Sequence, residues 1–270
     1  MTLRYGAVLT SLRSLRGDPV TIDVAATAAA VAYRERPARR GEILPLADLY
    51  VPAGANGASV VLVHGGGFVI GSRTMKPMRY LVAQLTAAKV AVCAIDYRMI
   101  FRGGRLDEAI DDVCDAFSFW SRRAPGYGLD PRRIHIAGLS AGGTLAMLAA
   151  ARIAGVAGVV GCFGLYDVGH LQGPATLLPR MLFGTADRAA WSARAPQAAP
   201  QPIAPTLLLH GTDDGLVPVD QARRLAARRE AHGLPTRLVI YDGAPHGFFN
   251  YPLPVAATAA RDMIDHVTRA

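Results

Sequence analysis

The sequence is poor in cysteine and contains no long apolar run. Its three cysteines, Cys93, Cys114 and Cys162, lie in apolar segments and none belongs to a CxxC pair. This spacing argues against a metal site and favours buried free thiols in a reducing compartment. No stretch of about 18 apolar residues occurs, so we expect no membrane span. Arginines interrupt the apolar residues of the N-terminal segment, which does not read as a secretory signal, and we expect a cytoplasmic protein.

Lysine is almost absent as well, being confined to Lys76 and Lys89, so arginine supplies nearly all of the positive charge. The formal net charge of the 270 residues is +8. The basic residues are scattered in short pairs, without a long basic run or an interleaved aromatic pattern. We therefore predict no nucleic-acid partner and interpret the arginines as residues of helix surfaces.

What the chain does contain is an alternation of apolar runs with amphipathic segments. The apolar runs predict strands at 58–65, 90–97, 132–140, 156–166, 205–211 and 236–243. The amphipathic segments predict helices at 78–89, 105–124, 142–154, 219–233 and from about 255 onward. This alternation is typical of an α/β fold with a mostly parallel central sheet flanked by helices, here one domain over residues 1–270.

Two segments do not follow this alternation. Residues 1–40 are rich in alanine and arginine, and the stretches near 5–16 and 22–35 are predicted to be helical. Residues 167–205 contain proline and glycine throughout and have room for one or two short helices. We expect both segments to form a small cap over the domain.

A serine follows the strand predicted at 132–140, in the motif Gly138-x-Ser140-x-Gly142. A nucleophilic serine at such a position needs a sharp, strained turn that lifts its Oγ off the sheet, and the two glycines relieve the crowding of that turn. The helix that follows directs free N–H groups and the positive end of its dipole toward the serine. The plainer alternative is a glycine-rich helix start that only packs tightly.

An acid and a histidine follow two later strands. The segment HGTDDGLVP contains Asp213 and Asp214, and we favour Asp214 as the acid that orients a histidine. His246 lies in the segment APHGF, in a loop closed by glycines. Taken singly, the acid has the plainer reading of an Asx turn, and the histidine that of a surface residue. The chain order Ser140, Asp214, His246 is the order expected when the nucleophile turn comes first.

Three consecutive glycines, Gly65 to Gly67, follow the strand predicted at 58–65. Glycine loses more conformational freedom on folding than any other residue, so three in a row require a reason. Without side chains in the way, their N–H groups can approach a reacting centre. Together with the N–H of Ala141 they can surround a developing oxyanion. A bare tight turn would need only one glycine.

Together these motifs resemble the α/β-hydrolase fold and, within it, the carboxylesterases similar to hormone-sensitive lipase. HGGGFVIGS is similar to the oxyanion motif of that group, GYGLDPRRIHIAGLSAGG to its nucleophile segment, and AIDYR to the strand end between them. HGTDDGLVP and APHGF are similar to its acid and base segments. The resemblance covers about residues 45–270. Two features depart from the group: Leu139 stands where an acid is usual, and MIFRGG follows DYR.

The resemblance implies roles for individual residues. Ser140 is implied as the nucleophile, His246 as the base and Asp214 as the acid that orients it. The implied oxyanion donors are the backbone N–H groups of Gly65, Gly66 and Ala141, with His64 and Gly67 shaping the loop. No metal and no organic cofactor are implied.

The function implied is that of a serine hydrolase that cleaves small-molecule carboxylic esters through an acyl-enzyme on Ser140. The short cap favours short acyl chains. An arylformamidase or amidase on the same triad is the alternative, because it runs the same acyl chemistry. A non-catalytic small-molecule-binding homologue is a further one. The sequence leaves the natural substrate and the presence of a homodimer open.

Acyl pockets are mostly apolar, so we expect Phe68, Leu139 and Phe248 to contact the substrate. Weaker candidates for the pocket lie in the excursion and are Met181, Leu182 and Phe183. Three basic residues follow strand ends near the site, and they either favour an acidic substrate or are solvated. They are Arg73, Arg98 and Arg102.

Overall fold

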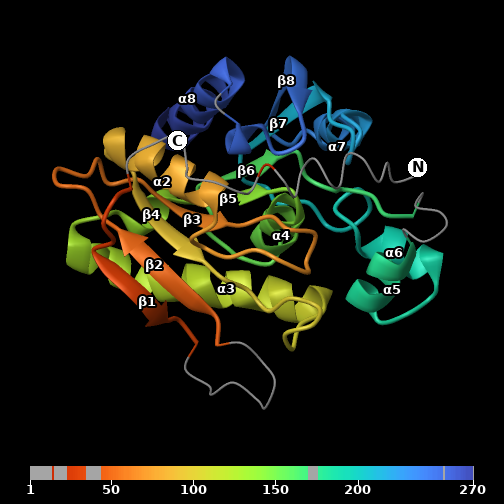
Figure 1. Cartoon of the computed structure of the whole chain (residues 1–270), viewed down its shortest axis with the longest axis horizontal. Helices are drawn as coiled ribbons and strands as arrows, with labels where there is room; N and C mark the ends of the chain where they lie inside the picture. Colours follow the sequence, from red (N-terminus) through yellow and green to blue (C-terminus); the bar gives the residue numbers. More distant parts are fainter. Residues whose placement is uncertain (1–13, 15–22, 35–43, 170–175, 252, 270) are drawn as a thin grey trace.

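The computed structural model describes residue 14 and residues 23–34, 44–169, 176–251 and 253–269. Within these residues an eight-stranded sheet has the order β1-β2-β4-β3-β5-β6-β7-β8 (Figure 1). The strands are β1 (Ala28–Ala32), β2 (Leu46–Tyr50), β3 (Ser59–Val63), β4 (Ala91–Ile95), β5 (Ile134–Leu139), β6 (Gly158–Cys162), β7 (Thr206–Asp213) and β8 (Thr236–Pro245).

The sheet is mostly parallel, as the sequence predicts. Six neighbouring strands run parallel to one another, namely β4, β3, β5, β6, β7 and β8. Strand β2 pairs antiparallel with β4. Every residue of β3, β4, β5 and β6 is buried, because helices cover both faces of the sheet. This double cover is why these strands appear in the sequence as continuous apolar runs.

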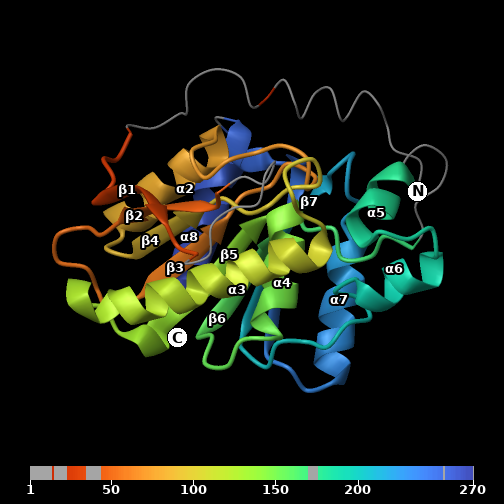
Figure 2. The same ribbon diagram turned by 90° about the horizontal axis from the view of Figure 1, so that it is seen from below.

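Two hydrophobic cores lie on opposite faces of the sheet, since successive side chains of a strand point to opposite sides. Val61 and Val63 of β3 pack into one core with the helices α3 (Leu106–Arg123), α4 (Ala141–Ala150) and α7 (Asp220–Ala231). Val60 and Leu62 pack into the other core with α2 (Lys76–Ala87) and α8 (Pro254–Arg269). Figure 2 shows α3 and α8 on the two sides of the sheet.

The N-terminal part of the described chain differs from the prediction. The helix predicted over 22–35 is wrong, because Ala28–Ala32 form strand β1, which pairs antiparallel with β2. A bulge interrupts the pairing, and the Ala30 N–H donates to Asp48 Oδ1 at 2.7 Å. Alanine favours helices, but backbone pairing at the sheet edge outweighs this weak preference.

The other predictions for the N-terminal segment fall mostly on residues that the structure does not describe. The helix predicted near 5–16 and most of the predicted cap over 1–40 lie outside the described residues. Strand β2 occupies a stretch for which the sequence motifs predicted no element.

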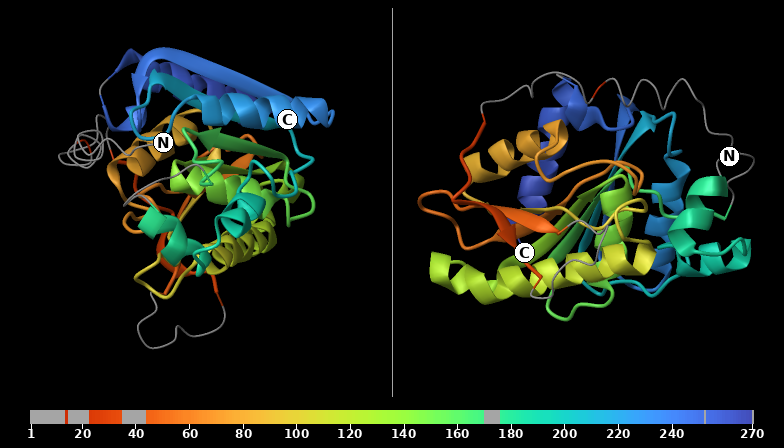
Figure 3. Two further views of the ribbon diagram at one scale, coloured as in Figure 1. Left: turned by 90° about the vertical axis from the view of Figure 1, so that its right-hand side faces the viewer. Right: turned by 60° about the horizontal axis from the view of Figure 1, so that its bottom comes forward.

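Two short helices, α5 (Leu177–Phe183) and α6 (Arg188–Arg194), lie within the excursion at 167–205, as predicted. Figures 2 and 3 show both at the end of the molecule toward which the parallel strands run. Gln221 of α7 holds the chain where the excursion begins. Its Oε1 accepts the N–H groups of Tyr166 and Asp167, each at 2.7 Å, and its Nε2 donates to the Asp167 carbonyl at 2.8 Å.

Every strand and helix predicted after residue 58 is present, with ends that differ by a few residues. Among the helices of the described segments, none combines the length and the apolar character needed to cross a bilayer.

Two histidines meet at the other end of the sheet, where β5 begins. The rings of His135, which is fully buried, and His266 of α8 lie 6.2 Å apart in an edge-to-face arrangement. Burial, and after it repulsion from His266, lowers the pKa of His135 from 6.5 to about 4, and burial also lowers the pKa of His266. The folded protein therefore holds these side chains in their neutral form.

We expect acid to destabilise the fold through this pair. Below its ordinary pKa of 6.5 the His135 side chain binds a proton in the unfolded chain but not in the native one, so stability falls as the pH drops from 6.5 to about 4. The free energy of unfolding should be lower at about pH 4.5 than at pH 7 by roughly 2 to 3 kcal/mol from His135 alone. Denaturant titrations at the two pH values measure this difference.

The matched variants are His135→Gln and, as the control, His232→Gln at an exposed position. Glutamine is neutral at every pH, so His135→Gln should flatten the pH dependence while His232→Gln leaves it intact. Equal wild-type stability at both pH values would contradict the assignment.

Candidate active site

Three polar side chains directly follow the last residues of their strands. Ser140 comes after β5, Asp214 after β7 and His246 after β8. Because these strands are parallel, their carboxyl ends lie along one edge of the sheet, where ligands of such folds bind. The structure thus brings together three residues that are far apart in the sequence.

Ser140 occupies the sharp turn that the sequence predicts. Its backbone has φ 52° and ψ −115°, a conformation that residues other than glycine rarely adopt. A Cβ on Gly138 would lie 2.0 Å from the Gly142 carbonyl oxygen, and one on Gly142 would lie 2.3 Å from the Val63 carbonyl oxygen. Both glycines are therefore required by close backbone packing, and α4 begins directly after the serine.

Hydrogen bonds join the three side chains in a line. His246 Nδ1 lies 2.7 Å from Asp214 Oδ2, and His246 Nε2 lies 3.0 Å from Ser140 Oγ. An ionised carboxylate can only accept, so Nδ1 carries the hydrogen and Nε2 is left to accept the serine hydroxyl. Ser140 is only half-buried.

Asp214 is a buried carboxylate with a complete set of donors. Its Oδ1 accepts the N–H groups of Leu216 at 2.9 Å and Val217 at 2.7 Å, while its Oδ2 faces His246 and His210. Burial raises its pKa, but the hydrogen bonds from His210 and His246 outweigh burial and lower the pKa to about 2. Asp213, the neighbouring acid, is exposed as the last residue of β7.

His210 is a partner of this acid that the sequence analysis missed. Its side chain is fully buried, and its Nε2 lies 3.0 Å from Asp214 Oδ2 and 2.9 Å from the Val217 carbonyl oxygen. A carbonyl only accepts, so Nε2 carries the hydrogen and donates toward both oxygens. The sequence signal was the HG pair four residues before Asp214, which also fits an ordinary buried strand end.

The glycine loop lies against the serine turn. A Cβ on Gly65 would lie 2.9 Å from the Leu139 carbonyl oxygen and 3.3 Å from Ser140 Cβ. His64 contacts the loop, because its Nδ1 lies 2.6 Å from the Gly65 carbonyl oxygen. Its ring stacks on that of Tyr97, with 4.3 Å between the ring centroids. Burial lowers the pKa of His64, so the imidazole stays neutral.

The three predicted pocket residues do not form one pocket wall. Phe68 is 2% exposed and packs into the core with α3 and α4, whereas Leu139 and Phe248 pack into the core on the other face. The ring that does contact the histidine is Phe163, just after β6, whose centroid lies 5.0 Å from that of His246. Sequence reasoning missed Phe163 because an aromatic residue after a strand is most often plain core.

Two of the three arginines noted near the site form ion pairs within the protein. Arg73 Nε lies 2.8 Å from Asp48 Oδ1, and its guanidinium also pairs with Asp96. Arg98 is 2% exposed and lies 2.9 Å from Asp112 Oδ2. Both guanidinium groups are thus engaged with carboxylates of the protein, Arg98 in the interior and Arg73 with partial exposure.

The arrangement of strands and loops is shared with solved structures of esterases. A truncated carbohydrate esterase from gut microbiota superposes with a TM-score of 0.77 at 20% sequence identity, covering 94% of this chain and 99% of that one. The thermophilic esterase Est2 of Thermogutta terrifontis gives a TM-score of 0.70 at 22% identity, covering 88% and 90% of the two chains. The protein has the α/β-hydrolase fold, as the motifs predict.

Residues 47–228 match the model of the BD-FAE family, and the chain belongs to this family. An isoprenylcysteine alpha-carbonyl methylesterase of Arabidopsis thaliana is 25% identical over 245 residues, which cover 80% of this chain and 55% of that protein. An acetyl esterase of Salmonella paratyphi B is 27% identical over 246 residues, covering 79% and 73%. The chain spans about half the length of the plant methylesterases that it matches.

The glycine loop offers a test of its own packing. Gly66 has φ +113°, and a Cβ there would lie 1.9 Å from the Ile70 carbonyl oxygen, whereas Gly67 has φ +61° and open space around it. We expect Gly67→Ala to cost about 1 to 2 kcal/mol of unfolding free energy, the cost of a left-handed backbone. Gly66→Ala should cost at least about 3 kcal/mol, because strain and a backbone clash add up. Denaturant titration of both variants measures the difference, and equal costs would contradict the described loop.

Proposed function

We propose that this protein is a serine carboxylesterase in which Ser140 attacks the ester carbonyl. The observation that carries the proposal is the unbroken line of hydrogen bonds from Ser140 Oγ through His246 to Asp214. The position of Ser140 beside the glycine loop supports the same conclusion. The relatives and structural neighbours described above support it as well, since each is named as an esterase. Other acyl-transfer reactions on the same triad differ only in the leaving group.

In the proposed reaction His246 Nε2 takes the proton of Ser140 as Oγ bonds to the carbonyl carbon. The carbonyl oxygen becomes an oxyanion, which the N–H groups of Gly65, Gly66 and Ala141 stabilise. His246 then protonates the departing alcohol, leaving the acyl group on Ser140. Water, deprotonated by the same imidazole, attacks the acyl-enzyme and restores the serine. Asp214 stays ionised throughout, holds the imidazole in one tautomer and stabilises its charged form.

We infer that the acyl group is short. Within the described part of the predicted cap there are two helices of only seven residues each, α5 and α6. The apolar residues predicted to contact the acyl chain, Phe68, Leu139 and Phe248, are almost fully buried in two separate cores and expose little surface to such a chain. The Salmonella relative is named as an acetyl esterase, which fits this inference.

The function is tested with p-nitrophenyl acetate, butyrate and octanoate. We expect the acetate and butyrate esters to be cleaved faster than the octanoate, and Ser140→Ala to lose at least about a thousandfold in kcat, because the nucleophile is gone. The variant should unfold at the wild-type denaturant concentration. Hydrolysis that persists in Ser140→Ala would refute the proposed nucleophile, and a preference for octanoate would refute the short acyl group.

The acid is tested with two neighbouring substitutions of the same kind. Asp214→Asn should lower kcat by a factor of about ten thousand, because an amide neither holds the correct imidazole tautomer nor stabilises its positive charge. Asp213→Asn is the matched control, since that side chain is exposed, and should change kcat by less than about threefold. The reverse ranking in a steady-state assay would show that Asp213 is the acid.

A further inference from the structure

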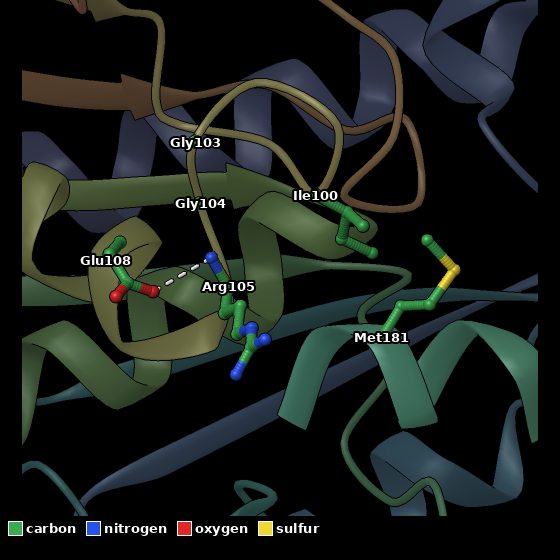
Figure 4. A pocket seen from close by; sticks show the side chains of 6 residues that line it. All are labelled: Ile100, Gly103, Gly104, Arg105, Glu108 and Met181. Atoms are coloured by element: carbon green, nitrogen blue, oxygen red, sulfur yellow. Dashed lines mark hydrogen bonds between the residues drawn. The ribbon is translucent and has the colours of Figure 1, made fainter. Parts of the chain in front are cut away.

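A cavity of about 420 Å³ opens between the body of the protein and the cap. Its lining consists of Ile100, Gly103, Gly104, Arg105, Glu108 and Met181. Figure 4 shows that the loop after β4, the first turn of α3 and the cap helix α5 each contribute side chains or backbone to its walls. The volume is within the range of pockets that bind small organic molecules.

This cavity adjoins the glycine loop of the candidate active site. The Ile100 N–H donates to the Phe68 carbonyl oxygen at 2.9 Å, and Phe68 directly follows the three glycines. Ile100 therefore connects the wall of the cavity to the loop whose first glycine packs against Ser140. To occupy both places, a substrate must extend from Ser140 along this loop.

The charged groups of the cavity are not equivalent. Glu108 Oε2 accepts the backbone N–H of Arg105 at 2.9 Å, which commits this carboxylate to the start of α3 (Figure 4). The Arg105 guanidinium extends away from Glu108 and forms no ion pair with any carboxylate of the described residues. Arg73 and Arg98 at the same edge of the sheet are both paired internally.

The cap limits where this guanidinium can go. A Cβ on Gly184, at the end of α5, would lie 2.4 Å from Arg105 Nη1, so the guanidinium packs against the backbone of the cap. Arg105 is an exposed residue whose guanidinium lies between α3 and the end of α5, and the apolar side chains of Ile100 and Met181 line the same cavity (Figure 4).

We propose that this cavity is a carboxylate-binding subsite and that the substrates are small esters which carry a second, free carboxylate bound by Arg105. The planar guanidinium offers paired N–H donors that match a carboxylate. Ile100 and Met181 receive the short carbon chain between the two groups. The single positive charge of Arg105 matches one carboxylate, and the neighbouring carboxylate of Glu108 repels a phosphate dianion more strongly than it repels a monoanion. This inference rests on the proposed esterase function and adds its substrate class.

The test uses two matched pairs of esters, because the free carboxylate can lie on either side of the ester bond. The first pair is mono-p-nitrophenyl succinate and p-nitrophenyl butyrate, with the charge on the acyl side. The second pair is 4-acetoxybenzoate and its methyl ester, with the charge on the alcohol side. For each pair the ratio of kcat/KM, charged over neutral, is measured in the wild type, Arg105→Gln, Arg105→Lys and Arg102→Gln.

We expect the wild type to prefer the charged member of at least one pair, and Arg105→Gln to lower that ratio about tenfold. Arg105→Lys should retain part of the preference, because it keeps the charge but not the paired donors. Arg102 is exposed on the same loop and does not line the cavity, so Arg102→Gln should keep the wild-type ratio.

The inference is overturned if neither pair shows a preference for the charged member. It is also overturned if Arg105→Gln leaves the ratio unchanged, or if Arg102→Gln lowers it equally, since the effect is then the general field of a basic protein. Hydrolysis of the neutral esters reports separately on the proposed function. Their cleavage without any Arg105 effect removes only the subsite, whereas no cleavage of any ester removes both proposals.

Discussion

The site depends on one close contact, in which the backbone of the loop after β3 packs directly on the turn after β5. Gly142 allows the turn to approach the carbonyl oxygens of Val63 and His64, and Gly138 allows the turn to close on itself. Gly65 completes the contact from the other side. Any Cβ at these positions would overlap a backbone atom, which cannot move aside as the end of a side chain can. The glycines thereby set both the conformation of Ser140 and the position of the loop beside it.

A second constraint is the burial of an ionised carboxylate. A buried charge is tolerated only when hydrogen bonds replace the water it has lost, and Asp214 meets this requirement with two backbone N–H groups and two imidazoles. The same bonds orient the carboxylate, so that one oxygen is directed at His246. His210 is thus linked to His246 through the Asp214 carboxylate that both imidazoles face. The geometry of the site is consequently tied to the folding of the turn after β7.

The sequence predicted those features that depend on residues close together in the chain, and it missed those that depend on distant segments. Amphipathic helices and strands buried on both faces can be recognised from a short window of sequence. Beyond residue 58 these elements were predicted correctly. Strand β1 was missed because its alanines favour a helix and only pairing with a distant strand makes them extended. The arginines show the same limit: Arg98 and Arg105 lie a few residues apart, yet one is buried on Asp112 and the other lines a cavity. Nothing in their neighbouring residues distinguishes them.

By itself the sequence determined the α/β architecture, the glycines that the turns require, and the order of Ser140, Asp214 and His246 along the chain, because each depends on residue types within a few positions. The tertiary structure decided which of two adjacent acids meets His246. It also revealed the second histidine on that acid, and the cavity formed where α5 approaches the start of α3. These features join segments far apart in the chain, and their distances follow from how the strands pair and the helices pack.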